Sequence, residues 1–241
     1  MKILCVSDTT DSLIYSQVAP DLYRDASFVI SAGDLPLRYY DYIATMLGKD
    51  VYYVYGNHNL EDYDRMMYGS DDSGLTTITG LARGAKFLSL PHFGGSFVDG
   101  KCVYDRNRDL IIMGLGGSML YNNGKSQYSE AQMQWRIGKL IPRLLYNKQR
   151  YGRYLDILIT HAPPRGMGDG EDLCHRGFEC FVSFMDRFRP RYLLHGHVHL
   201  DDLNAPRVIE YKDTKVINIY RNYLLEDKEL DNYGQHLNKR R

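Results

Sequence analysis

The sequence predicts an α/β fold in which two mixed β-sheets pack face to face and helices cover their outer surfaces. Apolar runs of strand length alternate with helical segments along most of the chain, which is typical of layered α/β proteins. Runs punctuated by glycine in the middle of the chain, and a further pair near its end, indicate hairpins and therefore antiparallel strands. The chain has 241 residues, 44% of them hydrophobic, which is enough for one domain with a substantial core.

Five short apolar runs predict the buried strands, because continuous runs of this length are typical of strands covered on both faces. They are residues 3–6, 28–30, 51–55, 155–159 and 192–194. Helices are expected between them at residues 37–47, 129–151 and 178–188. Ser129 can cap the second of these helices, and Pro142 is expected to kink it.

The hairpin signals fall in two regions of the chain. Four runs follow one another at residues 86–90, 93–98, 101–104 and 110–113, and another pair lies at residues 207–211 and 215–219. We expect residues 1–221 to form a single domain. Residues 222–241 are polar and charged, which indicates a C-terminal tail or a short helix.

Composition excludes several classes of protein. The chain carries 30 basic and 30 acidic residues, so it lacks the basic excess of a dedicated nucleic-acid binder. No run approaches the roughly 18 apolar residues of a membrane helix, and the first apolar run is too short for a signal peptide. The four cysteines show no paired spacing. These features predict a cytoplasmic protein with free thiols and no membrane partner.

Polar side chains that can bind a cation follow each of the five predicted strands. Because ligands gather at the carboxyl ends of strands in α/β sheets, we expect these side chains to converge. Imidazole, carboxylate and amide groups together favour manganese, iron, zinc or cobalt over magnesium or calcium. His195 belongs to the last strand, and we interpret it as structural. The candidate metal ligands are Asp8, Asp34, Asn57, His161, His197 and His199.

The order and spacing of these motifs resemble the calcineurin-like metallophosphoesterase superfamily. Single motifs of this length carry little information, but five in order, each after a predicted strand, are specific. The resemblance spans residues 3–199, and the fold it implies is a β-sandwich of mixed sheets flanked by helices. The segments that carry it are Asp8, Gly33-Asp34, Gly56-Asn57-His58, His161 and Gly196-His197-Val198-His199.

The resemblance implies a site with two divalent metal ions. Asp34 would bridge the two ions, and Asp8 and His199 would hold one of them. A metal-bound hydroxide would attack the phosphorus of a phosphodiester or phosphomonoester. His58 would not bind metal but would protonate the departing oxygen, which is worth about 10²–10⁴-fold in rate. The ligands of the other ion would be Asn57, His161 and His197.

Two positions depart from the superfamily pattern. Thr10 stands where a metal-binding histidine is usual, and Asn59 stands where an aspartate or glutamate usually follows the Gly-Asn-His motif. A neutral hydroxyl is a poorer ligand than imidazole, so the ion held by Asp8 is expected to bind more weakly. Water or Asp11 could fill the gap, although Asp11 is better interpreted as an N-cap.

Two residues near the fourth motif are candidates for substrate binding. His175 and Arg165 lie in the loop that follows His161, where they could contact the substrate phosphate, or hold the loop and remain solvated. The expected partner is a phosphorylated small molecule. The alternative is a member with weak or no activity that serves as a binding scaffold. Thr10 favours this alternative, whereas the retained His58 argues against it.

Overall fold

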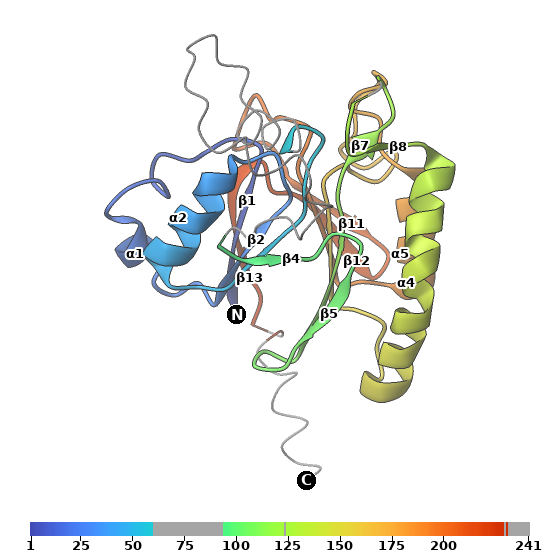
Figure 1. Ribbon diagram of the computed structural model, residues 1–241, viewed down its shortest axis with the longest axis horizontal. Helices are drawn as coiled ribbons and strands as arrows, with labels where there is room; N and C mark the ends of the chain where they lie inside the picture. Colours follow the sequence, from blue (N-terminus) through green and yellow to red (C-terminus); the bar gives the residue numbers. More distant parts are fainter. Residues whose placement is uncertain (60–93, 123, 229, 231–241) are drawn as a thin grey trace, which may run out of the picture.

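The computed structural model describes residues 1–59, 94–122, 124–228 and 230 (Figure 1). In this part of the chain, two large sheets pack against each other, and helices cover the outer face of each. Figure 1 shows α2 on the outside of the first sheet and α4 on the outside of the second. The expected α/β sandwich of two mixed sheets is confirmed.

The first sheet has the strand order β13-β1-β2-β3-β4. Strands β1 to β4 run parallel, and β13 pairs with β1 in the antiparallel direction. The carboxyl ends of the parallel strands therefore lie at one edge of the sheet. The strands are β1 (Lys2–Ser7), β2 (Phe28–Ser31), β3 (Val51–Tyr53), β4 (Ser96–Phe97) and β13 (Arg221–Glu226).

The second sheet has the strand order β11-β12-β10-β9-β6-β5. Its four inner strands are parallel, and antiparallel partners close both edges. A small parallel pair, β7 (Ser118–Met119) and β8 (Gln127–Tyr128), lies apart from it. The six strands are β5 (Cys102–Asp105), β6 (Leu110–Leu115), β9 (Ile157–Thr160), β10 (Tyr192–His195), β11 (Val208–Tyr211) and β12 (Thr214–Asn218).

Three apolar cores hold the layers together. The central core joins both sheets through fully buried side chains such as Ile30 and Ile159. A second core packs the first sheet against α2, and a third packs the other sheet against α4 and α5. No helix in the described ranges is both long enough and apolar enough to cross a bilayer. The helices are α1 (Ala19–Leu22), α2 (Leu37–Leu47), α4 (Glu130–Tyr151) and α5 (Glu179–Phe188).

The C-terminal part corrects one expectation. Residues 221–226 form β13, so the tail expected from residue 222 is wrong for its first five residues. Leu225 of this strand is buried in the core between the sheets, whereas Leu224 is exposed and three of the other four residues, Arg221, Asn222 and Glu226, are polar or charged. Polar residues are common on edge strands, where they discourage pairing with other chains. Because of these polar residues, the sequence did not predict a strand here.

The middle of the chain is partly as expected. The hairpin at residues 101–113 is confirmed as β5 and β6, and the pair near residue 211 as β11 and β12. β4 differs, because it extends the first sheet parallel to β3 instead of joining a hairpin. The run at residues 86–90 lies outside the described residues. The short helix α1 was not expected.

Helix α4 begins with a capping box. Ser129 Oγ accepts a hydrogen bond from the Gln132 backbone, and the Gln132 side chain accepts one from the Ser129 N–H. Pro142 lies on the exposed face and does not end the helix, since Leu140 and Leu144 pack into the core on either side of it.

Replacement of Ser129 by alanine should lower the free energy of unfolding by about 1 kcal/mol, because the backbone N–H of Gln132 loses its acceptor, the Ser129 hydroxyl. Urea unfolding monitored by circular dichroism measures this change. An unchanged midpoint would show that the box contributes nothing.

Candidate metal centre

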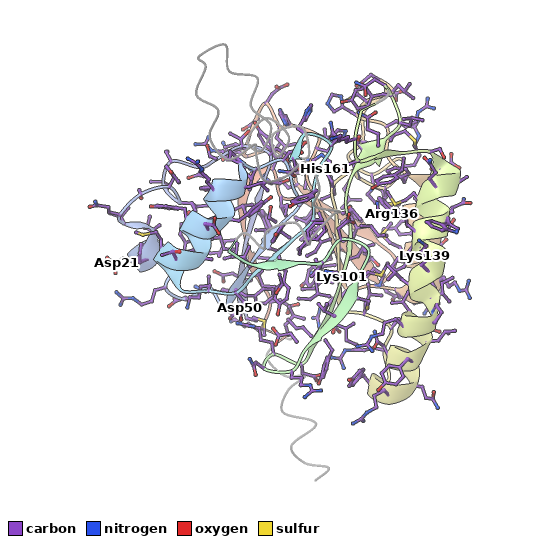
Figure 2. All side chains as sticks on the ribbon, in the orientation of Figure 1. Asp21, Asp50, Lys101, Arg136, Lys139 and His161 are labelled. Atoms are coloured by element: carbon purple, nitrogen blue, oxygen red, sulfur yellow. The ribbon has the colours of Figure 1, made fainter. Side chains whose placement is uncertain are left out.

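The candidate ligands lie where the parallel strands of both sheets end. Asp8 follows β1 and Asp34 follows β2, while His161 comes directly after β9. Figure 2 shows His161 between the two sheets, near the end where these loops gather. Parallel strands in facing sheets thus bring together side chains that are more than one hundred residues apart in sequence.

The centre of the site is a contact between His161, Asn57 and Asp34. The His161 Nε2 atom lies 2.9 Å from Asn57 Oδ1 and 3.2 Å from Asp34 Oδ2. Its Nδ1 atom lies 2.8 Å from the Ala32 carbonyl oxygen, which can only accept, so Nδ1 carries a proton. Nε2 therefore faces two oxygen acceptors.

His197 completes this group from the loop after β10. Its Nε2 atom lies 2.8 Å from the Cys174 carbonyl oxygen and must donate to it, so Nδ1 carries a lone pair, which accepts no hydrogen bond from the residues that the structure describes. The His161 and His197 rings are 4.7 Å apart between centroids, and ligand atoms of Asp34, His161 and His197 lie within 4.8 Å of one another. Metal-bound histidines characteristically donate their second N–H to a carbonyl in this way.

Asp8 and His199 form the more open side of the site. The Asp8 side chain is only 2% exposed, and its oxygens accept from the His197 backbone N–H at 3.0 and 3.1 Å. His199 Nε2 lies 4.0 Å from Asp8 Oδ1, and its ring stacks on Tyr220. Thr10 is exposed. Fewer potential ligand atoms therefore lie close together on this side than around His161.

Asp11 does not contribute to the site. Its Oδ1 atom accepts from the backbone N–H groups of Leu13 and Ile14, as an N-cap would, although a turn and not a helix follows. Its Oδ2 atom accepts from the side chains of Arg221 and Asn222. Asp11 thus links the turn that follows β1, through Oδ1, to the start of β13, through Oδ2.

The backbone is strained and crowded where the ligands lie. Asp8, Asp34 and His197 have φ angles of 65°, 54° and 68°, a region that costs non-glycine residues about 1–3 kcal/mol each. A Cβ on Gly56 would lie 2.2 Å from Asp34 Oδ1, and one on Gly196 would lie 2.3 Å from Asp8 Oδ2. Such strain characteristically occurs at functional sites.

Burial and the charges of neighbouring ligands set the ionisation of the site. Burial alone would raise the pKa of Asp34, but His161 lowers it to about 2. Burial likewise opposes protonation of His161, yet Asp34 and Asp8 raise its pKa to about 9. Burial lowers the pKa of His197 to about 3, so this ring is neutral.

This donor set fits a divalent cation. The Asp34 carboxylate and the Asn57 amide oxygen both face Nε2 of His161, whose Nδ1 already donates to a carbonyl oxygen. Either a metal ion or a proton on Nε2 must therefore lie between this nitrogen and the two oxygens. Burial also raises the pKa of Asp8, which indicates a carboxylate that needs a nearby cation. Imidazole with carboxylate and amide oxygens suits manganese, iron, zinc or cobalt.

Comparison with known proteins assigns the chain to a family. The sequence matches the profile of the calcineurin-like phosphoesterase family over residues 1–201. The chain belongs to this family. The family supports metal-dependent hydrolase chemistry in general. A comparison with curated proteins gives no match.

Two solved structures resemble this chain to different degrees. The protein TT1561 of Thermus thermophilus superposes with a TM-score of 0.56 at 15% identity, covering 91% of this chain and 89% of that one. The sulfate thiohydrolase SoxB of Thermus thermophilus, solved with glycerol, gives a TM-score of 0.39 at 15% identity, covering 86% and 36%. At this identity, the likeness to TT1561 concerns the fold alone.

The three candidate residues that are not proposed metal ligands are His58, His175 and Arg165. His58 is exposed, and its backbone N–H donates to Asp34 Oδ1 at 2.9 Å. The His175 ring lies 5.2 Å from that of His197, and its Nδ1 contacts Asp172 Oδ2 at 2.8 Å. Arg165 instead pairs with Asp169 at 2.7 Å, within its own loop.

Sequence reasoning missed two residues that hold the ligands. Tyr121 accepts a hydrogen bond from Asn57 Nδ2 at 3.1 Å, which turns the Asn57 oxygen toward His161. The buried Asn59 side chain accepts from the backbone N–H groups of Asp34 and Gly56, at 2.7 and 2.8 Å. The position of Asn59 directly after the Gly-Asn-His motif was the only sequence signal, and Tyr121 had none.

Proposed function

We propose that this protein is a phosphoesterase that hydrolyses a phosphodiester or phosphomonoester at a binuclear metal centre. Asp34 would bridge the two ions, Asp8 and His199 would hold one, and the other would have the ligands Asn57, His161 and His197. The observation that carries the proposal is the contact of His161 Nε2 with the oxygens of Asn57 and Asp34.

Divalent cations in this site would act as Lewis acids that lower the pKa of a water ligand and neutralise phosphate charge. The chain's own residues set the geometry. Ala32 and Cys174 fix the tautomers of His161 and His197 through their carbonyl groups. His58 stands exposed beside Asp34, where protonated imidazole could donate to the leaving oxygen.

Manganese binding should release protons. The pKa of metal-free His161 is about 9, so near pH 7 the ring is protonated and must lose the Nε2 proton to become a ligand. The affinity should therefore rise about tenfold per pH unit up to a pH of about 9 and then level off. Calorimetry in buffers of different ionisation enthalpy measures this release, and a binding heat that does not depend on the buffer would contradict it.

The hydrolytic proposal is tested with bis-p-nitrophenyl phosphate. We expect turnover that depends on manganese, and replacement of His58 by alanine should lower the rate by about 10²–10⁴-fold if it protonates the leaving oxygen. The variant should keep its manganese affinity, because His58 is not a proposed ligand. No activity above the metal-only blank with manganese, iron, cobalt or zinc would instead support a binding scaffold.

A further inference from the structure

A cavity of about 490 Å³, a volume typical of small-molecule sites, is lined by residues of loops that also contact the candidate metal ligands. Two of its lining residues connect it to the ligands. Leu120 precedes Tyr121, whose hydroxyl contacts Asn57, and Leu173 precedes Cys174, whose carbonyl oxygen contacts His197. Along the chain, two lining residues of the cavity are thus each followed by a residue that contacts a proposed metal ligand.

Part of this wall is apolar and open to solvent. Leu120 and Leu173 are 43% and 50% exposed, and Met119 lines the cavity beside them. Large apolar side chains left exposed in a concave surface next to a reactive centre indicate a ligand with an apolar body.

The charges of the cavity are only partly balanced. Arg165 pairs with Asp169. The carboxylate of Glu130 accepts from the first backbone N–H groups of α5, those of Glu179 and Cys180. Arg176, by contrast, has no hydrogen-bond or ion-pair partner among the residues that the structure describes.

Glu179 is the second unbalanced charge. This residue lines the same cavity and is exposed, and within the described ranges its carboxylate also lacks an ion-pair partner. One cation and one anion are therefore available to a ligand, next to an apolar surface. A ligand that matches Arg176, Glu179 and the apolar wall needs an anionic group, a hydrogen-bond donor and an apolar body.

We propose that this cavity receives the leaving group of the substrate, and that this group is apolar or aromatic, with an anion that binds Arg176 and an ammonium or hydroxyl that binds Glu179. The inference rests on the proposed phosphoesterase function, because it places the scissile phosphate at the metal centre. It narrows the substrate to phosphate esters of zwitterionic or similarly polar-ended aromatic alcohols.

Binding of phosphonate probes tests the inference without turnover. The parent probe is 4-(phosphonomethyl)phenylalanine, whose carbon–phosphorus bond resists hydrolysis. One derivative lacks the carboxylate and another lacks the amine. Calorimetry on the manganese-loaded protein should show that the parent binds about tenfold more tightly than either derivative, as expected for one charge-assisted hydrogen bond.

Variants assign each preference to a side chain. Arg176→Ala should abolish the preference for the carboxylate, while Arg176→Lys should keep part of it because the positive charge remains. Glu179→Gln should abolish the preference for the amine. Arg150→Ala is the control, since Arg150 lies at the far end of α4, about 30 Å from Ser129 at the cavity, and should bind all three probes as the wild type does.

Several results would overturn the inference: no binding of any probe, equal binding of all three by the wild type, or a carboxylate preference that survives in Arg176→Ala. Failure of the phosphoesterase proposal would be seen separately, because bis-p-nitrophenyl phosphate carries neither a carboxylate nor an amine in its leaving group. A protein that hydrolyses this diester but shows no probe preference would refute only the assignment of the cavity.

Discussion

Replacement of His161 by alanine is expected to lower metal-dependent hydrolysis by more than about 100-fold. Loss of a hydrogen-bonding partner behind a metal ligand already costs about 10–100-fold in affinity or activity, and His161 is itself a proposed ligand. Its fully buried ring contacts Asn57, Asp34 and Ala32 at once, so no neighbouring side chain can replace it.

The change should be measured as manganese affinity and as turnover of bis-p-nitrophenyl phosphate. His195→Asn is the matched control, since His195 is another fully enclosed histidine whose Nδ1 contacts the Gly196 carbonyl oxygen and no proposed ligand. That variant should lose stability but keep the manganese affinity. Equal losses of affinity in both variants would show that the effect of His161 arises from packing alone.

Replacement of Gly196 by alanine is expected to have the second largest effect. The new Cβ would lie 2.1 Å from Ser7 Oγ and 2.3 Å from Asp8 Oδ2, so the chain after β10 must move away from the end of β1. Overpacking of this kind costs about 1–3 kcal/mol in unfolding free energy. It would also break the two hydrogen bonds from the His197 N–H to Asp8 and so displace both ligands.

Gly138→Ala provides the control for this prediction. Gly138 lies inside α4, and no atom outside the helix backbone lies within 4 Å of the position that a Cβ would take, so alanine should stabilise the protein by about 0.5–1 kcal/mol. Thermal unfolding and manganese binding distinguish the two variants. If Gly196→Ala unfolded like the wild type and bound manganese equally well, the close approach of β10 to β1 would not matter.

Much of the site could be predicted from local sequence because each ligand follows a buried apolar strand closely. The strand run before Asp34 and the one before His161 are both continuous and apolar, and the carboxyl ends of parallel strands meet at one edge. The type and order of the ligands then indicated the chemistry. This reasoning needs no knowledge of contacts between distant segments.

The supporting contacts could not be predicted in this way. Tyr121 reaches Asn57 from the segment after β7, and the group at Cys174 that contacts His197 is a backbone carbonyl, which carries no sequence signal. The partner of Arg165 was also hidden, since the turn that brings Asp169 to it is formed only in the folded loop. Tertiary contacts decide these roles, and side-chain type does not.

The most direct test of the binuclear centre is anomalous diffraction at the manganese edge from crystals grown with manganese. We expect two peaks that share Asp34. A strong peak should contact His161 and His197, and a weaker one should lie beside Asp8 and His199, where Thr10 supplies no imidazole. A lone peak elsewhere, or no peak at Asp34 in a folded and manganese-saturated crystal, would contradict the binuclear centre on which the proposed phosphoesterase function depends.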